Sequence, residues 1–302
     1  MTTFFEFLWF EIRYQLRQPV FYIGIALFFL LTFGAVTTDA VSIGGGIGSL
    51  NRNAPYVIMQ ILAVMSILGV FTSTAIVANS TYRDIEHNTQ SVFFSTPITK
   101  GSYLFGRFWG ATIASILIFA GVVLAFIIGS LMPWLEPDRI GPFTSAPYIY
   151  SMLMIVIPNL LMTGALFFSL AALTRSLLYT YAGLVGFFVA YAVSQVLLTD
   201  VHNETVASLL DPFGLAAFTF ATRYWTVFEK NSMIGPTTGL LFYNRLLWLG
   251  IAGIVLFIAY KRFRFTTASG KAKKKKLDVE LPEVIQPGTV TTAVAQDFSS
   301  AA

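Results

Sequence analysis

The chain has 302 residues, of which 56% are hydrophobic and only 11% are charged. Soluble domains carry about 25% charged residues, so this composition excludes an ordinary soluble domain and indicates a membrane protein. The net charge is +4 and the sequence contains no cysteine. A disulfide framework and a thiolate metal site are therefore excluded as well.

Residues 3–18 precede the first apolar run and predict an interfacial helix. Their apolar side chains recur with helical spacing and are Phe5, Leu8, Trp9, Ile12 and Leu16. Glu6, Arg13 and Arg17 lie away from this stripe, and arginines combined with aromatic residues are typical of a helix lying flat on a membrane. A secretory signal peptide is the alternative, but acidic residues before the apolar run and the lack of a small-residue cleavage site disfavour it.

Six apolar segments approach the length of about 20 residues that crosses the hydrocarbon core of a bilayer. They are Phe21–Val36, Tyr56–Ala78, Leu104–Leu131, Tyr148–Leu173, Leu177–Leu198 and Leu240–Tyr260. The sequence therefore predicts an all-α, polytopic membrane protein with six transmembrane helices.

Basic residues are distributed unequally among the connectors. If the N-terminus is cytoplasmic, five of the 19 basic residues face outward and the other 14 face inward. The outward residues are Arg52, Arg139, Arg223, Lys230 and Arg245. Because lysine and arginine concentrate in cytoplasmic loops, we expect a multi-pass protein of the plasma or inner membrane with both termini in the cytoplasm.

The connector between the second and third spans, residues 81–100, is longer than a turn requires. Acidic residues early in it suit a helix N-terminus, and Pro97 ends the helical stretch. We interpret it as a cytoplasmic coupling helix that a partner contacts. The candidate contact residues are Arg83, Asp84, Glu86, His87, Gln90 and Phe93. A solvated loop whose charges only set the topology is the alternative.

The segment 199–239 is too polar to span a membrane but is rich in aromatic residues. We expect short outer half-helices that dip into the outer leaflet or lie on it, with a packed outer cap as the alternative. Asp211 followed by Pro212 predicts a helix start there, because aspartate caps helices and proline is tolerated at the first position.

Small residues recur every fourth position in two spans. Gly106, Gly110 and Ala114 form one stripe, and Ala182, Gly186 and Ala190 form the other. Such stripes let helix backbones approach closely in lipid. Either stripe suits packing within the chain or against a second copy, and the second is our candidate dimer surface.

Pro158 interrupts the fourth span and predicts a kink, because proline removes a helix hydrogen bond. Asn159 either satisfies the carbonyl freed by this proline or lines a substrate path. We expect no charged residue to be buried in a span away from its ends, which disfavours an ion-coupled carrier.

Signatures of enzymes are missing from the sequence. It contains neither a Walker A motif nor an HExxH zinc motif, and its two histidines fall on opposite sides of the expected membrane. We therefore expect no catalytic activity, no cofactor, no metal and no nucleic-acid partner.

Residues 266–302 are expected to form a basic, disordered cytoplasmic tail or linker, and residues 1–265 the membrane domain.

Taken in order, these features resemble the permease subunit of a type-2 ATP-binding-cassette (ABC) exporter. In that family a charged helix, a serine/threonine-proline-isoleucine turn and a glycine-basic pair follow one another. The corresponding segments here are Arg83–Phe94, Ser95–Ile98 and Gly106–Arg107. The similarity covers Phe4–Phe265, and the weakly amphipathic connector and the long lysine tail depart from the family pattern.

The resemblance implies ATP-driven transport, in the direction of export, by a dimer of permeases in the lipid bilayer. It implies that each permease docks a separate cytoplasmic ABC ATPase through the connector, and that the second permease is an identical copy or a paralogue. A membrane scaffold or assembly subunit that transports nothing is the alternative of a different class.

Overall fold

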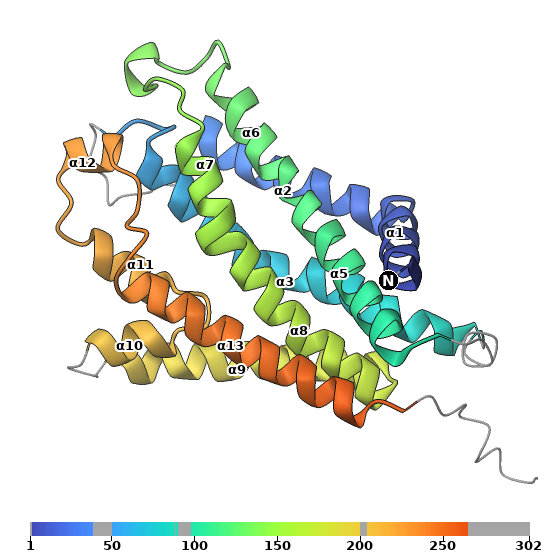
Figure 1. Cartoon of the computed structure of the whole chain (residues 1–302). Helices are drawn as coiled ribbons and strands as arrows, with labels where there is room; N and C mark the ends of the chain where they lie inside the picture. The colour runs from blue at the N-terminus through green and yellow to red at the C-terminus, as the bar shows by residue number, and fades with distance from the viewer. Residues whose placement is uncertain (1, 39–49, 88, 90–97, 200–203, 265–302) are drawn as a thin grey trace, which may run out of the picture. The chain divides into compact units, whose positions relative to one another are not determined.

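The computed structural model describes residues 2–38, 50–87, 89, 98–199 and 204–264. The chain divides into two units, Met1–Phe265 and Thr266–Ala302, and the expected cytoplasmic tail lies outside the described residues. The described part of the first unit consists of helices joined by turns, without strands (Figure 1).

The N-terminal helix, α1 (Thr2–Leu16), packs along α5 (Lys100–Ile118). The chain then turns at Gln18 into the first span, α2 (Pro19–Thr37), whose proline occupies the first helical position. The predicted apolar stripe of α1 is divided between two environments: Ile12 is buried, whereas Phe5 and Trp9 are exposed. The interior face of α1 also carries polar residues, which hydropathy alone does not reveal.

The second span is longer than we predicted. Helix α3 (Pro55–Glu86) continues without interruption into the start of the connector. The first residues of the expected charged helix Arg83–Phe94 therefore belong to the last turn of α3, and α3 ends at Glu86 with His87 as its C-cap. Residues 88 and 90–97, including the Ser95–Ile98 turn, lie outside the described residues.

The third span consists of α5 and α6 (Ala120–Ser130), which meet at Phe119. The fourth comprises α7 (Ala146–Ser151), a π-helical segment η2 (Met152–Val156) and α8 (Ile157–Thr174). The π-helical segment immediately precedes Pro158, where the proline ring would otherwise crowd the carbonyl four residues earlier. The expected disturbance of this span is thus a widened helical turn.

The fifth span is α9 (Leu177–Thr199) and the sixth is α13 (Leu240–Arg262). Between them, the described residues form three short helices: α10 (Glu204–Leu210), α11 (Leu215–Thr222) and α12 (Val227–Ser232). The predicted helix start at Pro212 is wrong, since α11 begins at Leu215 after a left-handed Gly214 with φ of 69°.

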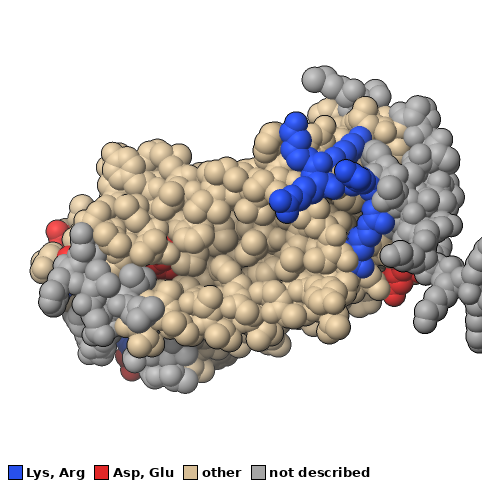
Figure 2. All heavy atoms as spheres, turned by 90° about the horizontal axis from the view of Figure 1, so that it is seen from below, with Lys and Arg blue, Asp and Glu red and all other residues tan. Residues whose placement is uncertain are grey.

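Six helical segments in the described part of the chain are long and apolar enough to cross a membrane. The protein therefore has the helices of a multi-pass membrane protein. The most hydrophobic windows of α3 and of α7–α8 are 67% buried, against 11% for α9, so α3 and α8 form the centre of the bundle. Much of the molecular face in Figure 2 carries neither acidic nor basic residues, and Lys and Arg gather at one end.

Candidate functional site

Six polar residues of α1, α3 and α5 meet in the interior, where we define them as the buried ionic cluster. The members are Glu11, Gln15, Arg83, Asp84, Tyr103 and Arg107, each at most 5% exposed. They lie at the two ends of the connector, because Asp84 is near the end of α3 and Tyr103 is near the start of α5. The cluster thus ties both ends of the connector to α1.

Arg107 is the centre of this cluster and is fully buried. Its Nη1 donates to Glu11 Oε2 at 2.7 Å, and its Nη2 donates to both carboxylate oxygens of Asp84 at 2.6 and 2.8 Å. One guanidinium therefore joins two carboxylates that come from different helices. Such charge-assisted contacts are short and directional, so they fix the relative orientation of the helices.

A second arginine completes the charge balance. Arg83 Nη2 donates to Glu11 Oε2 at 2.9 Å, and its guanidinium stacks on the Tyr14 ring at 3.6 Å. Gln15 Nε2 donates to the other Glu11 oxygen at 2.6 Å, and Tyr103 Oη donates to Asp84 at 2.7 Å. Two cations thus face two carboxylates, and the cluster is formally neutral when all four groups are ionised.

Close helix packing places Glu11 within reach of Arg107. A side-chain carbon added at Gly106 would lie 2.6 Å from Phe7 Cβ, and one added at Gly110 would lie 2.6 Å from Glu11 Cβ. Only glycine leaves enough room at these distances. The stripe that contains Gly106 and Gly110 therefore packs within the chain, against α1.

The pKa of the Glu11 carboxyl is changed by its buried position. Burial raises the pKa of Glu11 from its ordinary value of 4.5 to about 7, and the nearby Arg83 and the Gln15 amide act against this increase. The group is thus poised to change its charge close to neutral pH.

The predicted contact residues of the connector fall into three sets. Arg83 and Asp84 point into the buried ionic cluster and do not form an exposed surface, whereas Glu86 and His87 are exposed. Gln90 and Phe93 lie outside the described residues.

Sequence reasoning did not anticipate a site role for Glu11, Tyr103 or Arg107. The available signal was an acidic residue placed between apolar positions of α1, four residues before Gln15.

A second polar group, the amide–arginine cluster, lies among α3, α8, α13 and the turn before α11. Its members are Ser66, Asn159, Asp211, Asn244 and Arg245, all buried. Arg245 donates to the side-chain oxygens of Asn159 and Asn244, both at 2.6 Å. Asn159 donates to Ser66 Oγ at 2.8 Å and to the Phe213 carbonyl at 3.4 Å. Among the described residues, the side-chain hydrogen bonds of Asn159 thus join α8 to α3, α13 and the turn before α11, and none goes to the carbonyl that Pro158 leaves free.

Asp211 organises the turn that covers this cluster. Its carboxylate accepts from the backbone N–H groups of Phe213 at 3.0 Å and Ala216 at 2.7 Å, so the predicted capping residue binds the start of α11 from four residues before Leu215 and not from the position next to it. Burial raises the pKa of Asp211, and these two N–H groups and Arg245 lower it. A side chain at Gly214 would collide with Arg245, which explains a glycine in this left-handed position.

The expectation that no charged residue is buried in a span away from its ends is wrong for Arg245. It is the sixth residue of α13 and is only 4% exposed. It lies inside the predicted span Leu240–Tyr260, yet its charge is counted with those of the outer connectors, because a charge near the end of an apolar run is assigned to the adjoining loop.

The second small-residue stripe lies on an open surface. Ala182, Gly186 and Ala190 are exposed on α9, and a side-chain carbon added at Gly186 would have no neighbour within 4 Å. This face is therefore available to lipid or to a second molecule.

Comparisons of the chain with protein-family models and with curated proteins found no match.

Proposed function

We propose that the chain is the permease subunit of an ATP-driven type-2 ABC transporter, with export as the direction. The observation that carries the proposal is the buried ionic cluster. In it, Arg107 joins the two ends of the connector by binding Asp84, and it binds Glu11 of α1 as well. A force applied to the connector would reach three helices at once. Such a rigid junction suits a segment that transmits closure of an ATPase pair to the membrane helices.

The arrangement of basic residues supports a cytoplasmic position for the connector. Lys100 Nζ donates to the Lys261 carbonyl at 3.4 Å, and Arg175 Nη2 donates to the Arg264 carbonyl at 3.0 Å. The beginning of α5 and the ends of α8 and α13 thus present their basic residues together. Positive charge of this kind marks the cytoplasmic side.

The burial of Arg83 and Asp84 refines the way a partner would contact the connector. We assign direct docking to the exposed Glu86 and His87 and to the apolar Phe93 beyond them, and positioning of the connector to Arg83 and Asp84. The ATPase itself is a separate protein that supplies the energy for transport.

Docking through Phe93 and Glu86 gives the first test. Phe93→Ala is expected to weaken ATPase binding by about 1–3 kcal/mol, as truncation of an aromatic interface anchor does. Glu86→Lys is expected to uncouple ATP hydrolysis from transport, because it reverses a charge that sets the register of the interface.

Co-purification of an untagged ATPase and its turnover in reconstituted vesicles measure both effects. Glu136→Lys is the matched control, since Glu136 is also exposed but lies in another connector. Wild-type ATPase binding and full turnover in both connector variants would show that the connector is only a loop.

Assembly gives a second test. We expect a permease dimer that uses the Ala182, Gly186 and Ala190 face of α9. Gly186→Leu should weaken the dimer about ten-fold or more, because an added side chain separates two closely packed helices.

Gly250→Leu on α13 is the control for this substitution, since Gly250 is equally exposed and without neighbours within 4 Å. Counting subunits by photobleaching in vesicles at a series of dilutions measures the dissociation. An unchanged dimer in the Gly186→Leu variant would assign this face to lipid.

The buried Arg245 favours one other candidate function, an ion-coupled carrier, because ionisable groups inside a membrane protein often line ion paths. Flux in vesicles separates the two. Transport that needs ATP and the partner ATPase supports the permease, whereas transport driven by an ion gradient alone supports the carrier.

A further inference from the structure

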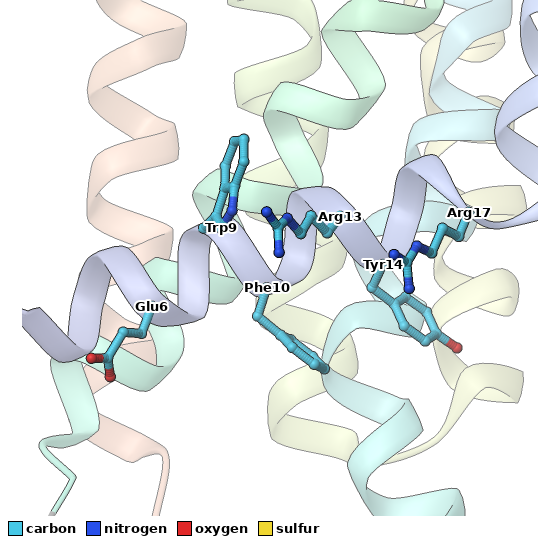
Figure 3. A pocket seen from close by; sticks show the side chains of 6 residues that line it. All are labelled: Glu6, Trp9, Phe10, Arg13, Tyr14 and Arg17. Carbon is cyan, nitrogen blue, oxygen red and sulfur yellow. The ribbon is translucent and has the colours of Figure 1, made fainter.

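A groove of about 440 Å³ lies on the outward face of α1 (Figure 3), and it adjoins the buried ionic cluster because Arg83 stacks on the ring of its lining residue Tyr14. Its lining residues are Glu6, Trp9, Phe10, Arg13, Tyr14 and Arg17. Five of them lie on α1 and Arg17 directly follows its last residue, and the opposite face of α1 packs on α5. The groove therefore faces the surroundings of the bundle.

Two guanidinium groups supply the positive charge of the groove. Arg13 and Arg17 are exposed and one helical turn apart, and neither has a carboxylate within ion-pairing distance among the described residues. The Arg13 guanidinium lies 5.1 Å from the centre of the Trp9 ring, which restricts its orientation. Glu6 lies at the other end of the groove, away from both arginines (Figure 3).

Aromatic rings form the rest of the groove. Trp9 is 54% exposed and Phe10 is 50% exposed, so a large apolar surface borders the two cations. Tyr14 is held in place by the Arg83 guanidinium stacked 3.6 Å from its ring. Because α2 begins at Pro19, Arg17 lies only two residues before this apolar span, and residues that flank a span are those that reach lipid headgroups.

We propose that this groove binds the phosphate of an anionic phospholipid. Arg13 and Arg17 hold the phosphate oxygens, for which forked guanidinium donors are well suited, and Trp9 and Phe10 contact the adjoining apolar part of the lipid. A soluble anion would use the two cations but not the exposed rings. The site anchors α1 against the membrane surface on the face opposite Glu11.

The test uses the full chain in detergent and measures retained lipid by native mass spectrometry with phosphatidylglycerol or phosphatidylcholine. R13Q/R17Q should lower the affinity for phosphatidylglycerol about 30-fold, and each single substitution about five-fold, while phosphatidylcholine binding stays unchanged. Trp9→Leu keeps both charges and should cost about two- to five-fold. Both arginines are exposed, so folding should be retained, and the single variants carry the test if the double variant does not fold.

K261Q/R262Q is the matched control, because it removes the same charge from the exposed end of α13. It should stay within about two-fold of wild type. Wild-type affinity in R13Q/R17Q, or an equal loss in the control, would overturn the site. Displacement of the lipid by soluble glycerol phosphate at equal concentration would assign the groove to a free anion and would reject the lipid.

Discussion

Replacing Arg107 by glutamine is expected to destabilise the protein by about 3–5 kcal/mol at pH 8, the cost of breaking a buried ion pair by removing one partner. The substitution leaves the carboxylates of Glu11 and Asp84 buried with Arg83 as their remaining cation. Thermal unfolding of the purified chain measures the loss. Arg262→Gln is the control, because Arg262 is exposed at the end of α13 and should change little.

The effect of Arg107→Gln should depend on pH in a defined direction. Burial raises the pKa of Glu11 to about 7, and losing a neighbouring cation raises it further. A carboxyl with a raised pKa in the folded state contributes its full stability below its ordinary pKa and loses it as the pH rises through the folded value. The variant should therefore lose less stability at pH 5 than at pH 8.

A second substitution shows whether Arg107→Gln destabilises the protein through the uncompensated carboxylates or only through lost side-chain packing. Adding Glu11→Gln to Arg107→Gln should restore part of the stability at pH 8, because it removes one of two buried carboxylates that then share a single cation, Arg83. Losses that simply add, or a pH-independent loss, would contradict the role given to the buried ionic cluster. Reduced substrate-stimulated ATPase turnover in Arg107→Gln, beyond the loss of folded protein, would connect this cluster to coupling.

Arg245→Met is expected to cost about 2–5 kcal/mol, because it leaves the buried side-chain oxygens of Asn159 and Asn244 without their donor. Each unsatisfied buried polar group costs about 1–3 kcal/mol. Thermal unfolding measures this loss as well. In a Phe213→Cys background, Arg245→Met should also increase the labelling of the introduced cysteine, because the turn before α11 loosens.

Arg223→Met provides the contrast for Arg245→Met. Arg223 pairs with Glu204 at 2.6 Å, but both side chains are about half exposed, and such surface pairs contribute little. If the two substitutions reduced the stability equally, the amide–arginine cluster would contribute no more to stability than an exposed ion pair does.

The sequence by itself determined the six spans and the existence of α1. A run of apolar residues is long enough to cross a bilayer whatever lies beside it, so the predicted spans agree with the helices to within a few residues at most ends. The largest difference is at α3, which continues to Glu86, because hydropathy ends a span at its first charges although the helix continues beyond them.

Only the tertiary structure decided which charges are buried and what they contact. Glu11, Asp84 and Arg107 meet although 96 residues separate Glu11 from Arg107, and this contact depends on the close approach of α1 at Gly106 and Gly110. Side-chain periodicity identifies the faces of one helix but not the helix that covers each face. Sequence patterns therefore predict that a charged residue is exposed. Only the structure shows where an opposite charge from another helix lies against it and both are buried.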